Sequence, residues 1–208
     1  MIRLYWAEVS GLSLETDSLP LSEYRRKKLI KISSELKKKQ SLGAELLLLH
    51  AVNGLFPGTQ IPLEISCMEN GKPVFDKLPL FFSLSHSANF AACAISDEPL
   101  GLDVEHGIIA RPKIVERYFN ADEQALYETS EDKDSFFAHL WTAKESALKY
   151  TGEGLGKGLS SVEIKDGYAL IKPENISLKL SQFCIEGTYI SLATKHEDDK
   201  LQIKKIIL

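Results

Sequence analysis

Two long helical segments in this sequence are each followed by strands that meet at tight turns. Apolar residues recur at helical spacing over residues 22–53 and again over 134–150. Strand-like runs follow both segments, with turns predicted at 70–71 after the first and at 166–167 and 186–187 after the second. A long helix followed by antiparallel strands predicts an α+β fold.

The two halves of the chain repeat this order of elements. The strand segments NFAACAIS at 89–96 and TYISLAT at 188–194 are also loosely alike. We therefore predict two similar α+β halves, an N-terminal half at 1–100 and a C-terminal half at 101–208. The first helical region is expected to break within KISSE, where a serine can cap a second helix.

Composition limits the class of protein. The 208 residues are 44% hydrophobic and 26% charged, with a formal net charge of -4 at pH 7, as in ordinary globular proteins. The acidic balance argues against a nucleic-acid partner, and the longest apolar run, at 46–52, is too short to cross a membrane. The N-terminus lacks signal-peptide features, so we expect a cytoplasmic protein in which Cys67, Cys93 and Cys184 are buried free thiols.

Positive charge gathers near the N-terminus of this acidic chain. The runs RRKK at 25–28 and KKK at 37–39 lie in the first helical region. One interpretation is a solvated helix face. The other is a binding surface for an anionic ligand or an acidic partner.

The predicted strand LGLDVE carries two carboxylates. Side chains alternate between the faces of a strand, so Leu102 and Val104 are expected to face the core. Asp103 and Glu105 then share the opposite face with Gly101. Two neighbouring carboxylates ionise together only where solvent, a cation or several donors stabilise them. Two alternatives follow: both point into solvent, or both hold a hard divalent cation such as Mg²⁺.

The second long helix brings charged residues next to its apolar face. At about 100° per residue, Lys144 falls inside the apolar stripe, and Glu145 and Lys149 lie together along its edge. Glu145 and Lys149 could form an ordinary surface ion pair. Lys144 either extends its ammonium group to solvent or needs an anionic partner. The alternative to these structural interpretations is that this edge of the helix lines a cleft that holds a phosphate and a metal ion.

A polar strand end and a lysine after a turn are candidates for phosphate binding. FSLSHS contains Ser83, Ser85 and His86, and Lys72 follows the predicted turn in GKP. Hydroxyls, an imidazole and turn amides are able to bind a phosphate, although an ordinary polar strand end is the simpler interpretation. The motifs G-x-S-x-G and G-x-x-x-x-G-K-[ST] are absent from the sequence, which argues against a hydrolase triad and ordinary P-loop nucleotide hydrolysis.

Three segments, taken in order, are more specific than any one of them. SLSHS at 83–87, GLDVE at 101–105 and WTAKESALKYTGEGL at 141–155 together resemble the signature of the phosphopantetheinyl transferases, of the surfactin-synthetase-activating type. GKP at 71–73 fits the same pattern, and the resemblance covers most of the chain, over residues 20–160. It implies a pseudo-two-fold arrangement of two similar α+β halves, with the active site at the interface between them.

The resemblance also implies a reaction and its residues. Phosphopantetheine would pass from coenzyme A to a serine of an acidic acyl or peptidyl carrier protein with the help of Mg²⁺, releasing adenosine 3′,5′-bisphosphate. By position, the implied metal ligands are Asp103, Glu105 and Glu145. The catalytic candidates are Glu145, as base for the serine proton, and Lys149, which matches a pyrophosphate-binding lysine. The residues implied to bind coenzyme A are Lys39, Lys72, Ser85, His86 and Lys149.

Some assignments are less direct. Lys39 stands where the family often carries an arginine. Lysine keeps the positive charge at this position but loses the bidentate phosphate geometry of arginine. Lys144 is a further candidate for a group that takes developing charge, and Glu123 is a second candidate for the base. Arg25 and the neighbouring basic residues could serve either coenzyme A or the carrier protein.

Two other functions stay open at this point. One is another Mg²⁺-dependent transferase that acts on a nucleotide such as ATP with the same carboxylates. The other is a non-catalytic carrier-protein-binding module with a decayed site. Because two similar halves in one chain would complete the cleft internally, we expect a monomer, with neither a nucleic-acid nor a membrane partner.

Overall fold

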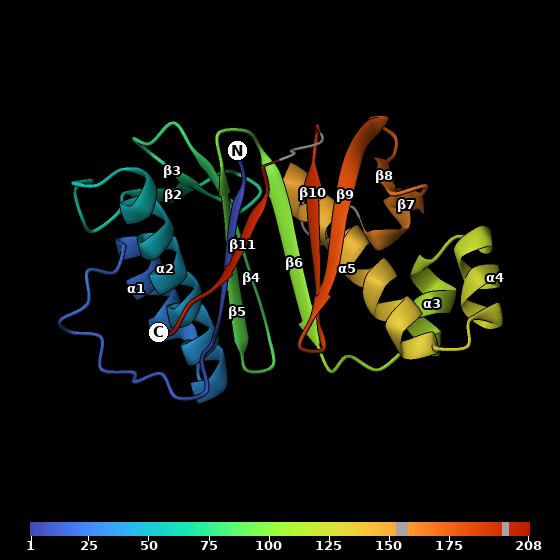
Figure 1. The fold of residues 1–208 in the computed structure, drawn as a ribbon, viewed down its shortest axis with the longest axis horizontal. Helices are drawn as coiled ribbons and strands as arrows, with labels where there is room; N and C mark the ends of the chain where they lie inside the picture. The colour runs from blue at the N-terminus through green and yellow to red at the C-terminus, as the bar shows by residue number, and fades with distance from the viewer. Residues whose placement is uncertain (153–157, 197–199) are drawn as a thin grey trace. The chain divides into compact units, whose positions relative to one another are not determined.

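The chain divides into two compact units, each with helices and a largely antiparallel sheet. The computed structural model describes residues 1–152, 158–196 and 200–208 (Figure 1). One unit comprises Met1–Pro99 with Asp198–Leu208, and the other comprises Leu100–Glu197. The predicted α+β fold class is confirmed. The end of the motif WTAKESALKYTGEGL, from residue 153 onward, lies outside the described residues.

The first unit is a sheet with a long helix, α2, packed on it. The strand order is β11-β1-β5-β4, in which β1, β5 and β4 are antiparallel neighbours and β11 runs parallel to β1. Strands β2 and β3 form a separate short hairpin, which precedes β4 in the chain. The elements are β1 (Arg3–Glu8), α1 (Glu23–Lys31), α2 (Glu35–Leu55), β2 (Ile65–Cys67), β3 (Pro73–Phe75), β4 (Phe81–Ser87), β5 (Phe90–Ser96) and β11 (Gln202–Lys205).

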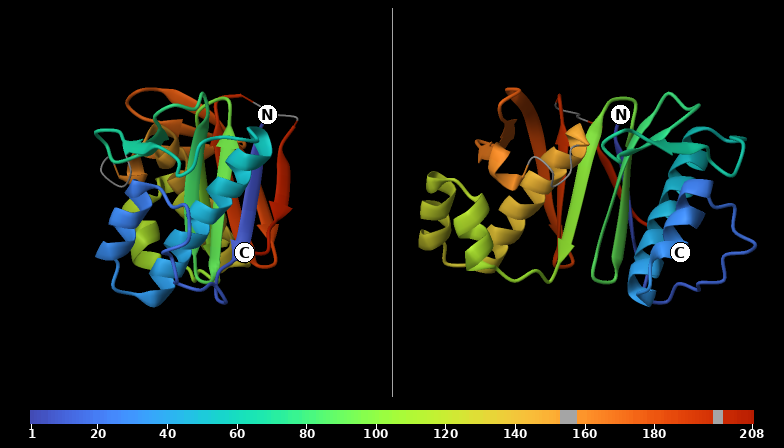
Figure 2. Two further views of the ribbon diagram at one scale, coloured as in Figure 1. Left: turned by 90° about the vertical axis from the view of Figure 1, so that its left-hand side faces the viewer. Right: turned by 180° about the vertical axis from the view of Figure 1, so that it is seen from behind.

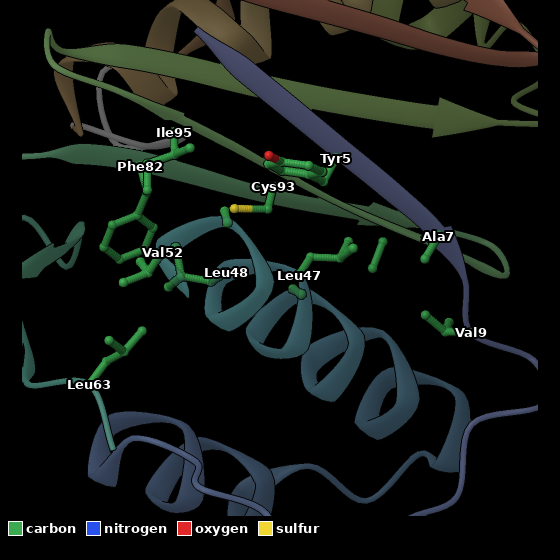
Figure 3. Packing of buried hydrophobic residues seen from close by; sticks show 13 residues of the cluster. Tyr5, Ala7, Val9, Leu47, Leu48, Val52, Leu63, Phe82, Cys93 and Ile95 are labelled. Atoms are coloured by element: carbon green, nitrogen blue, oxygen red, sulfur yellow. The ribbon is translucent and has the colours of Figure 1, made fainter. Parts of the chain in front are cut away.

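Apolar side chains from α2 and the sheet form the core of this unit. Leu47, Leu48 and Val52 of α2 are buried in one cluster with Tyr5 of β1 and Cys93 of β5 (Figure 3). Burying side chains of this size stabilises the fold by about 1.5–3 kcal/mol each. The apolar face of α2 therefore fixes the helix to the strands.

Local sequence decides where α1 and α2 begin. The expected break within KISSE is confirmed, because α1 ends at Lys31, the first residue of that segment, and the Ser34 side chain accepts a hydrogen bond from the Lys37 amide to cap α2. Helix α2 continues to Leu55, two residues beyond the expected end. All three cysteines are free, but the expectation that all are buried is wrong for Cys67 and Cys184, which lie in exposed strand segments.

The second unit repeats the combination of a sheet and a long helix, α5. The strand order is β6-β10-β9-β8-β7, and all neighbours are antiparallel. Helix α5 packs along β6 and β10, and the right-hand view of Figure 2 shows it beside β6. The elements are β6 (Leu100–His106), α3 (Pro112–Tyr118), α4 (Ala121–Thr129), α5 (Lys133–Thr151), a 3₁₀ turn (Leu159–Ser161), β7 (Val162–Lys165), β8 (Tyr168–Ile171), β9 (Ile176–Ile185) and β10 (Thr188–Thr194).

The two units share a strand topology. In the first unit β1 pairs with β5, which pairs with β4, and in the second β6 pairs with β10, which pairs with β9. The two loosely similar segments, 89–96 and 188–194, contain β5 and β10, which occupy matching places in the two sheets. The hairpin turns predicted at 166–167 and 186–187 are confirmed, and all four of their residues have positive φ, as type I′ turns require.

The C-terminal strand departs from the predicted division of the chain. Residues 101–208 were assigned to the C-terminal half, but β11 pairs with β1 in the sheet of the first unit. The register runs from Arg3 opposite Gln202 to Trp6 opposite Lys205. Strand β1 has an edge that β5 does not use, and β11 supplies the hydrogen-bonding partners for it. Among the described residues, no helix has both the length and the apolarity to cross a membrane.

Candidate functional site

Strand β6 and helix α5 approach each other closely at Gly101. A side-chain carbon built on Gly101 would lie 2.0 Å from the Ser146 carbonyl oxygen and 2.4 Å from the Tyr150 nitrogen. Only glycine therefore permits this contact between strand and helix backbone. Since Asp103 lies two residues along the same strand, its side chain is on the face that α5 covers.

The structure corrects the expected exposure of this strand face. Asp103 is only 5% exposed, so the alternative in which it points into solvent is wrong. Leu102 and Val104 are buried as expected. Both faces of β6 are therefore buried as far as Val104, and the next residue, Glu105, is half-buried. A carboxylate buried to this degree needs a compensating charge.

Lys149 supplies such a charge. Its Nζ atom donates a hydrogen bond of 2.6 Å to Oδ1 of Asp103, and the lysine side chain is 30% exposed. Lys149 lies one helical turn after Glu145 on α5. It pairs with Asp103 of β6, so the alternative in which Glu145 and Lys149 form only a surface ion pair is wrong. The pair places a cation and a carboxylate at one position, where α5 meets β6.

Glu145 of α5 interacts electrostatically with both carboxylates of β6. Burial and, next, the negative charges of Asp103 and Glu105 raise the pKa of Glu145 to about 7, while Lys149 opposes the rise. The structure thus brings Glu145 within electrostatic range of both strand carboxylates. A carboxyl with a pKa near neutrality exchanges its proton readily at physiological pH, which is the property required of a general base.

The donor chemistry of these residues fits a hard divalent cation. Among the residues that the structure describes, no three His, Cys, Asp or Glu side chains are already grouped as a metal site. The three carboxylates nevertheless carry oxygen donors of the kind Mg²⁺ prefers. A cation held between them would also remove the repulsion from Asp103 and Glu105 that helps to raise the pKa of Glu145.

The raised pKa of Glu145 predicts a pH-dependent stability. Its pKa rises from 4.5 to about 7 on folding, so the folded state binds this proton more tightly, and the resulting stabilisation is complete below about pH 4.5 and lost as pH rises through about 7. We therefore expect Glu145→Gln to be as stable as the parent at pH 4, and more stable at pH 8 by about 1–3 kcal/mol after allowance for partial exposure. Urea unfolding at both pH values measures the difference.

Glu163 of β7 provides the control for this prediction. A hydrogen bond from Lys172 lowers the pKa of Glu163, so Glu163→Gln should have the opposite sign and lose stability above about pH 4.5. Equal stability of the parent and Glu145→Gln at pH 8 would contradict the raised pKa.

Lys144 and Glu123 are partners in a buried ion pair. Lys144 Nζ lies 2.9 Å from Glu123 Oε2, and the two side chains are 0% and 3% exposed. The ammonium group also donates to the Val162 carbonyl, and Glu123 Oε1 accepts from the Ile164 amide at 3.0 Å. The pair joins α5, α4 and β7, which explains how a lysine can occupy the apolar face of α5.

This pair corrects two assignments from the sequence. Glu123 was a second candidate for the base, but it also closes the capping box of α4 with Asn120 and is fully engaged. Lys144 was a candidate for a group that takes developing charge, but its ammonium group is enclosed and paired, so burial lowers its pKa and keeps it from a ligand. Both residues are structural.

The residues implied to bind coenzyme A lie in the first unit, apart from Lys149. Lys72 is half-buried after the turn between β2 and β3, and burial lowers its pKa to about 8. Ser85 is buried on β4 and His86 beside it is exposed. Lys39 is held by the Ser10 carbonyl at 3.0 Å and by Glu35 on its own helix at 3.1 Å.

The basic region is divided by burial. Arg25 is only 2% exposed, and its Nε lies 3.2 Å from Oε2 of the buried Glu45. It also donates to Ser41 at 2.7 Å, so Arg25 ties α1 to α2 and is not available to a ligand, contrary to the sequence-based suggestion. The exposed members of the region are Arg26, Lys27, Lys28, Lys31 and Lys37.

Sequence reasoning missed Gly101 as a positioning residue. The signal was present, because a glycine two residues before Asp103 shares its strand face and removes the side chain that would hold a helix away. It also missed Thr142 and Ser191, whose hydroxyl groups are buried between α5 and β10.

Comparison with known proteins identifies a family whose model matches the segment that carries this site. The family model of the 4′-phosphopantetheinyl transferase superfamily matches residues 99–190, which include β6 and α5. The 4′-phosphopantetheinyl transferase psf-1 of Bacillus pumilus is 36% identical over 143 residues, which cover 64% of this chain and 60% of that protein. The 4′-phosphopantetheinyl transferase Sfp of Bacillus subtilis (strain 168) is 33% identical over 106 residues, or 50% of this chain and 47% of that protein.

The match with these first two relatives therefore spans only about half of their length. The match covers a larger share of a third relative. The 4′-phosphopantetheinyl transferase AcpT of Escherichia coli (strain K12) is 30% identical over 154 residues, which cover 69% of this chain and 73% of that protein. By these similarities the chain belongs to the 4′-phosphopantetheinyl transferase superfamily and is of the surfactin-synthetase-activating type.

Proposed function

We propose that this protein transfers 4′-phosphopantetheine from coenzyme A to a serine of an acyl or peptidyl carrier protein. The observation that carries the proposal is the group formed by Asp103, Glu105, Glu145 and Lys149 where α5 meets β6. Three carboxylates and a lysine suit a substrate that brings phosphate groups and a divalent cation together. The names of the relatives, all 4′-phosphopantetheinyl transferases, support the same reaction.

In the proposed reaction the serine oxygen forms a bond to the β-phosphorus of coenzyme A. The bond from that phosphorus to the bridging oxygen breaks, and adenosine 3′,5′-bisphosphate leaves with the electron pair. Glu145 takes the proton of the serine hydroxyl, because burial is the largest cause of its raised pKa and does not depend on its acidic neighbours. Lys149 would neutralise charge on the pyrophosphate, and the partial exposure of its ammonium group beside Asp103 supports this role.

Asp103, Glu105 and Glu145 are the residues that would hold Mg²⁺. When bound there, the ion would supply charge neutralisation to the phosphates during displacement. Lys149 now occupies Oδ1 of Asp103, so the ammonium group and the metal would divide the oxygens of the three carboxylates between them.

Lys72, Ser85, His86 and Lys39 are proposed to bind coenzyme A. Lys72 is the strongest candidate, because burial already lowers its pKa to about 8 and an anion would stabilise its charged form. Lys39 would have to exchange its contacts with Ser10 and Glu35 for a phosphate. The exposed basic residues of α1 and α2 suit an acidic carrier protein, which we propose as the second substrate.

Lys72→Met should weaken coenzyme A binding by about tenfold, because the variant loses one charge-assisted contact to a phosphate. At pH 8 the parent should also take up a fraction of a proton on binding, since the anion raises the pKa of Lys72 from about 8. Calorimetry in buffers of different ionisation enthalpy measures both quantities. Lys77→Met removes an exposed lysine of the same unit and should bind as the parent does. Unchanged affinity in Lys72→Met would exclude the contact.

The proposed function is tested by the mass of a carrier protein. An apo carrier incubated with this protein, coenzyme A and Mg²⁺ should gain the mass of one phosphopantetheine group. Parallel reactions with ATP in place of coenzyme A identify a different nucleotide transferase. Binding of the carrier without a change of mass would identify a non-catalytic module.

A further inference from the structure

Three residues lie in one row across the sheet of the second unit. In the strand register, Gln182 of β9 is opposite Ser191 of β10, and Ser191 is opposite Asp103 of β6. Residues directly opposite each other on neighbouring strands point to the same face of a sheet. Gln182, Ser191 and Asp103 therefore all face α5, which also contacts Asp103 through Lys149.

The first two members of the row are joined to α5 by a chain of hydrogen bonds. The Gln182 amide nitrogen donates to Ser191 Oγ at 2.9 Å and to the His139 carbonyl at 2.9 Å. Ser191 Oγ lies 2.7 Å from Thr142 Oγ1, and Thr142 Oγ1 lies 2.9 Å from the Ala138 carbonyl. The Ala138 carbonyl can only accept, so Thr142 donates its one hydroxyl hydrogen to it. Ser191 is therefore the donor in its bond to Thr142, while it accepts from the Gln182 amide.

The hydroxyl pair is the directional part of the packing between α5 and β10. Thr142 and Ser191 are both 0% exposed. Around them, α5 packs through Ala143, Ala147 and Leu148, and apolar contacts of this kind have no preferred direction. A buried hydrogen bond has a narrow range of length and angle, and breaking it costs free energy, because polar groups lose a partner that water cannot replace there. It therefore fixes the position of the helix along the strand.

Thr142 lies just before the catalytic part of α5. Glu145 follows it by three residues, on the next turn, and Ser146 and Tyr150 then meet β6 at Gly101. The segment that carries Glu145 is thus fixed on one side by the hydroxyl pair and on the other by the contact at Gly101. A shift of about 1 Å between reacting groups is enough to cost about a hundredfold in rate.

We propose that Thr142, Ser191 and Gln182 are positioning residues that set Glu145 and Lys149 of α5 opposite Asp103. The role rests on the proposed transfer reaction and on the proposed metal ligands. The three residues do not contact the substrate or the metal, and they act by holding helix and strand in one register. Outer residues that orient metal ligands typically change metal affinity or activity by about 10–100-fold when replaced.

Thr142→Val tests the proposal, because valine has the shape of threonine and lacks its hydroxyl group. We expect kcat to fall by about 10-fold or more, the KM for coenzyme A to stay within about twofold, and the dissociation constant for Mn²⁺ to rise by about 10-fold. Mn²⁺ serves as the probe for the carboxylate site and is measured by electron paramagnetic resonance in the presence of coenzyme A. Thr142→Ser keeps the hydroxyl group and should restore both quantities.

Ser146→Ala is the matched control. Ser146 is equally buried on α5, and it meets Gly101 through its main-chain carbonyl, which alanine retains. Its hydroxyl group bonds Ala143 of its own helix, so the loss of that group should leave kcat and Mn²⁺ affinity unchanged. Ser191→Ala removes the same hydroxyl pair from the strand side and replaces Thr142→Val if that variant does not fold. Parental kcat and Mn²⁺ affinity in both variants would overturn the proposal. If the parent transfers nothing, the proposed function fails, and the Mn²⁺ measurement still decides the positioning role.

Discussion

Asp103→Asn should abolish phosphopantetheine transfer while the protein stays folded. The substitution keeps the shape of the side chain but removes the charge that Lys149 now neutralises at 2.6 Å. It also takes one of three carboxylates from the proposed metal ligands. We expect kcat/KM to fall by at least about a hundredfold, as when a group that stabilises the transition state is removed. The carrier mass assay, with thermal unfolding alongside, measures transfer and folding together.

A second effect of this variant is independent of activity. The charge of Asp103 raises the pKa of Glu145, so the substitution should bring that pKa below about 7. Asp166→Asn is the control, because Asp166 is exposed in a hairpin turn with φ of 50°, a conformation that asparagine tolerates. Full transfer activity in Asp103→Asn would remove Asp103 from the site.

Lys144→Met should have the largest effect on stability. The Glu123 carboxylate is 3% exposed and would be left buried without its cation. Removal of one partner from a buried ion pair typically costs about 3–5 kcal/mol, although the Ile164 amide would still donate to Glu123. Urea unfolding at pH 7 measures the loss.

The double variant Lys144→Met with Glu123→Gln separates charge from packing. If the cost comes from an unpaired charge, the second substitution should recover most of the stability. Lys172→Met breaks a surface ion pair with Glu163 and should cost far less, because solvent screens the two charges. A loss in Lys144→Met no larger than this control would show that the buried pair contributes little.

The parts of the fold that depend on short stretches of sequence could be predicted. The capping box of Asn120 and Glu123 and the turns at 166–167 and 186–187 are local features, because their hydrogen bonds and backbone angles involve neighbouring residues. The burial of Leu102 and Val104 follows from strand alternation in the same way. Helix and strand positions were therefore largely correct.

Contacts between elements far apart in the sequence could not be predicted. The apolar stripe of α5 showed that Lys144 needs a partner, but only the packing of α4 against α5 shows that Glu123 is that partner. Arg25 looked like part of a basic surface, because the sequence does not place Glu45 beside it. The pairing of β11 with β1 likewise joins the two ends of the chain.

The candidate site was predicted in a similar, partial way. The spacing of Asp103 and Glu105 and that of Glu145 and Lys149 each suggested a common face. Their meeting depends on the close approach at Gly101, which no spacing along the chain expresses. The resemblance to a family supplied the link between strand and helix that local patterns lacked.

The central claim is that coenzyme A gives its phosphopantetheine group to a carrier-protein serine. The most direct test combines peptide mapping of the carrier with quantification of adenosine 3′,5′-bisphosphate in the same reaction. The account predicts phosphopantetheine on one serine and one bisphosphate nucleotide released for each group transferred. An unmodified serine and no released nucleotide, with fatty-acid, polyketide and peptide-synthetase carriers alike, would contradict it.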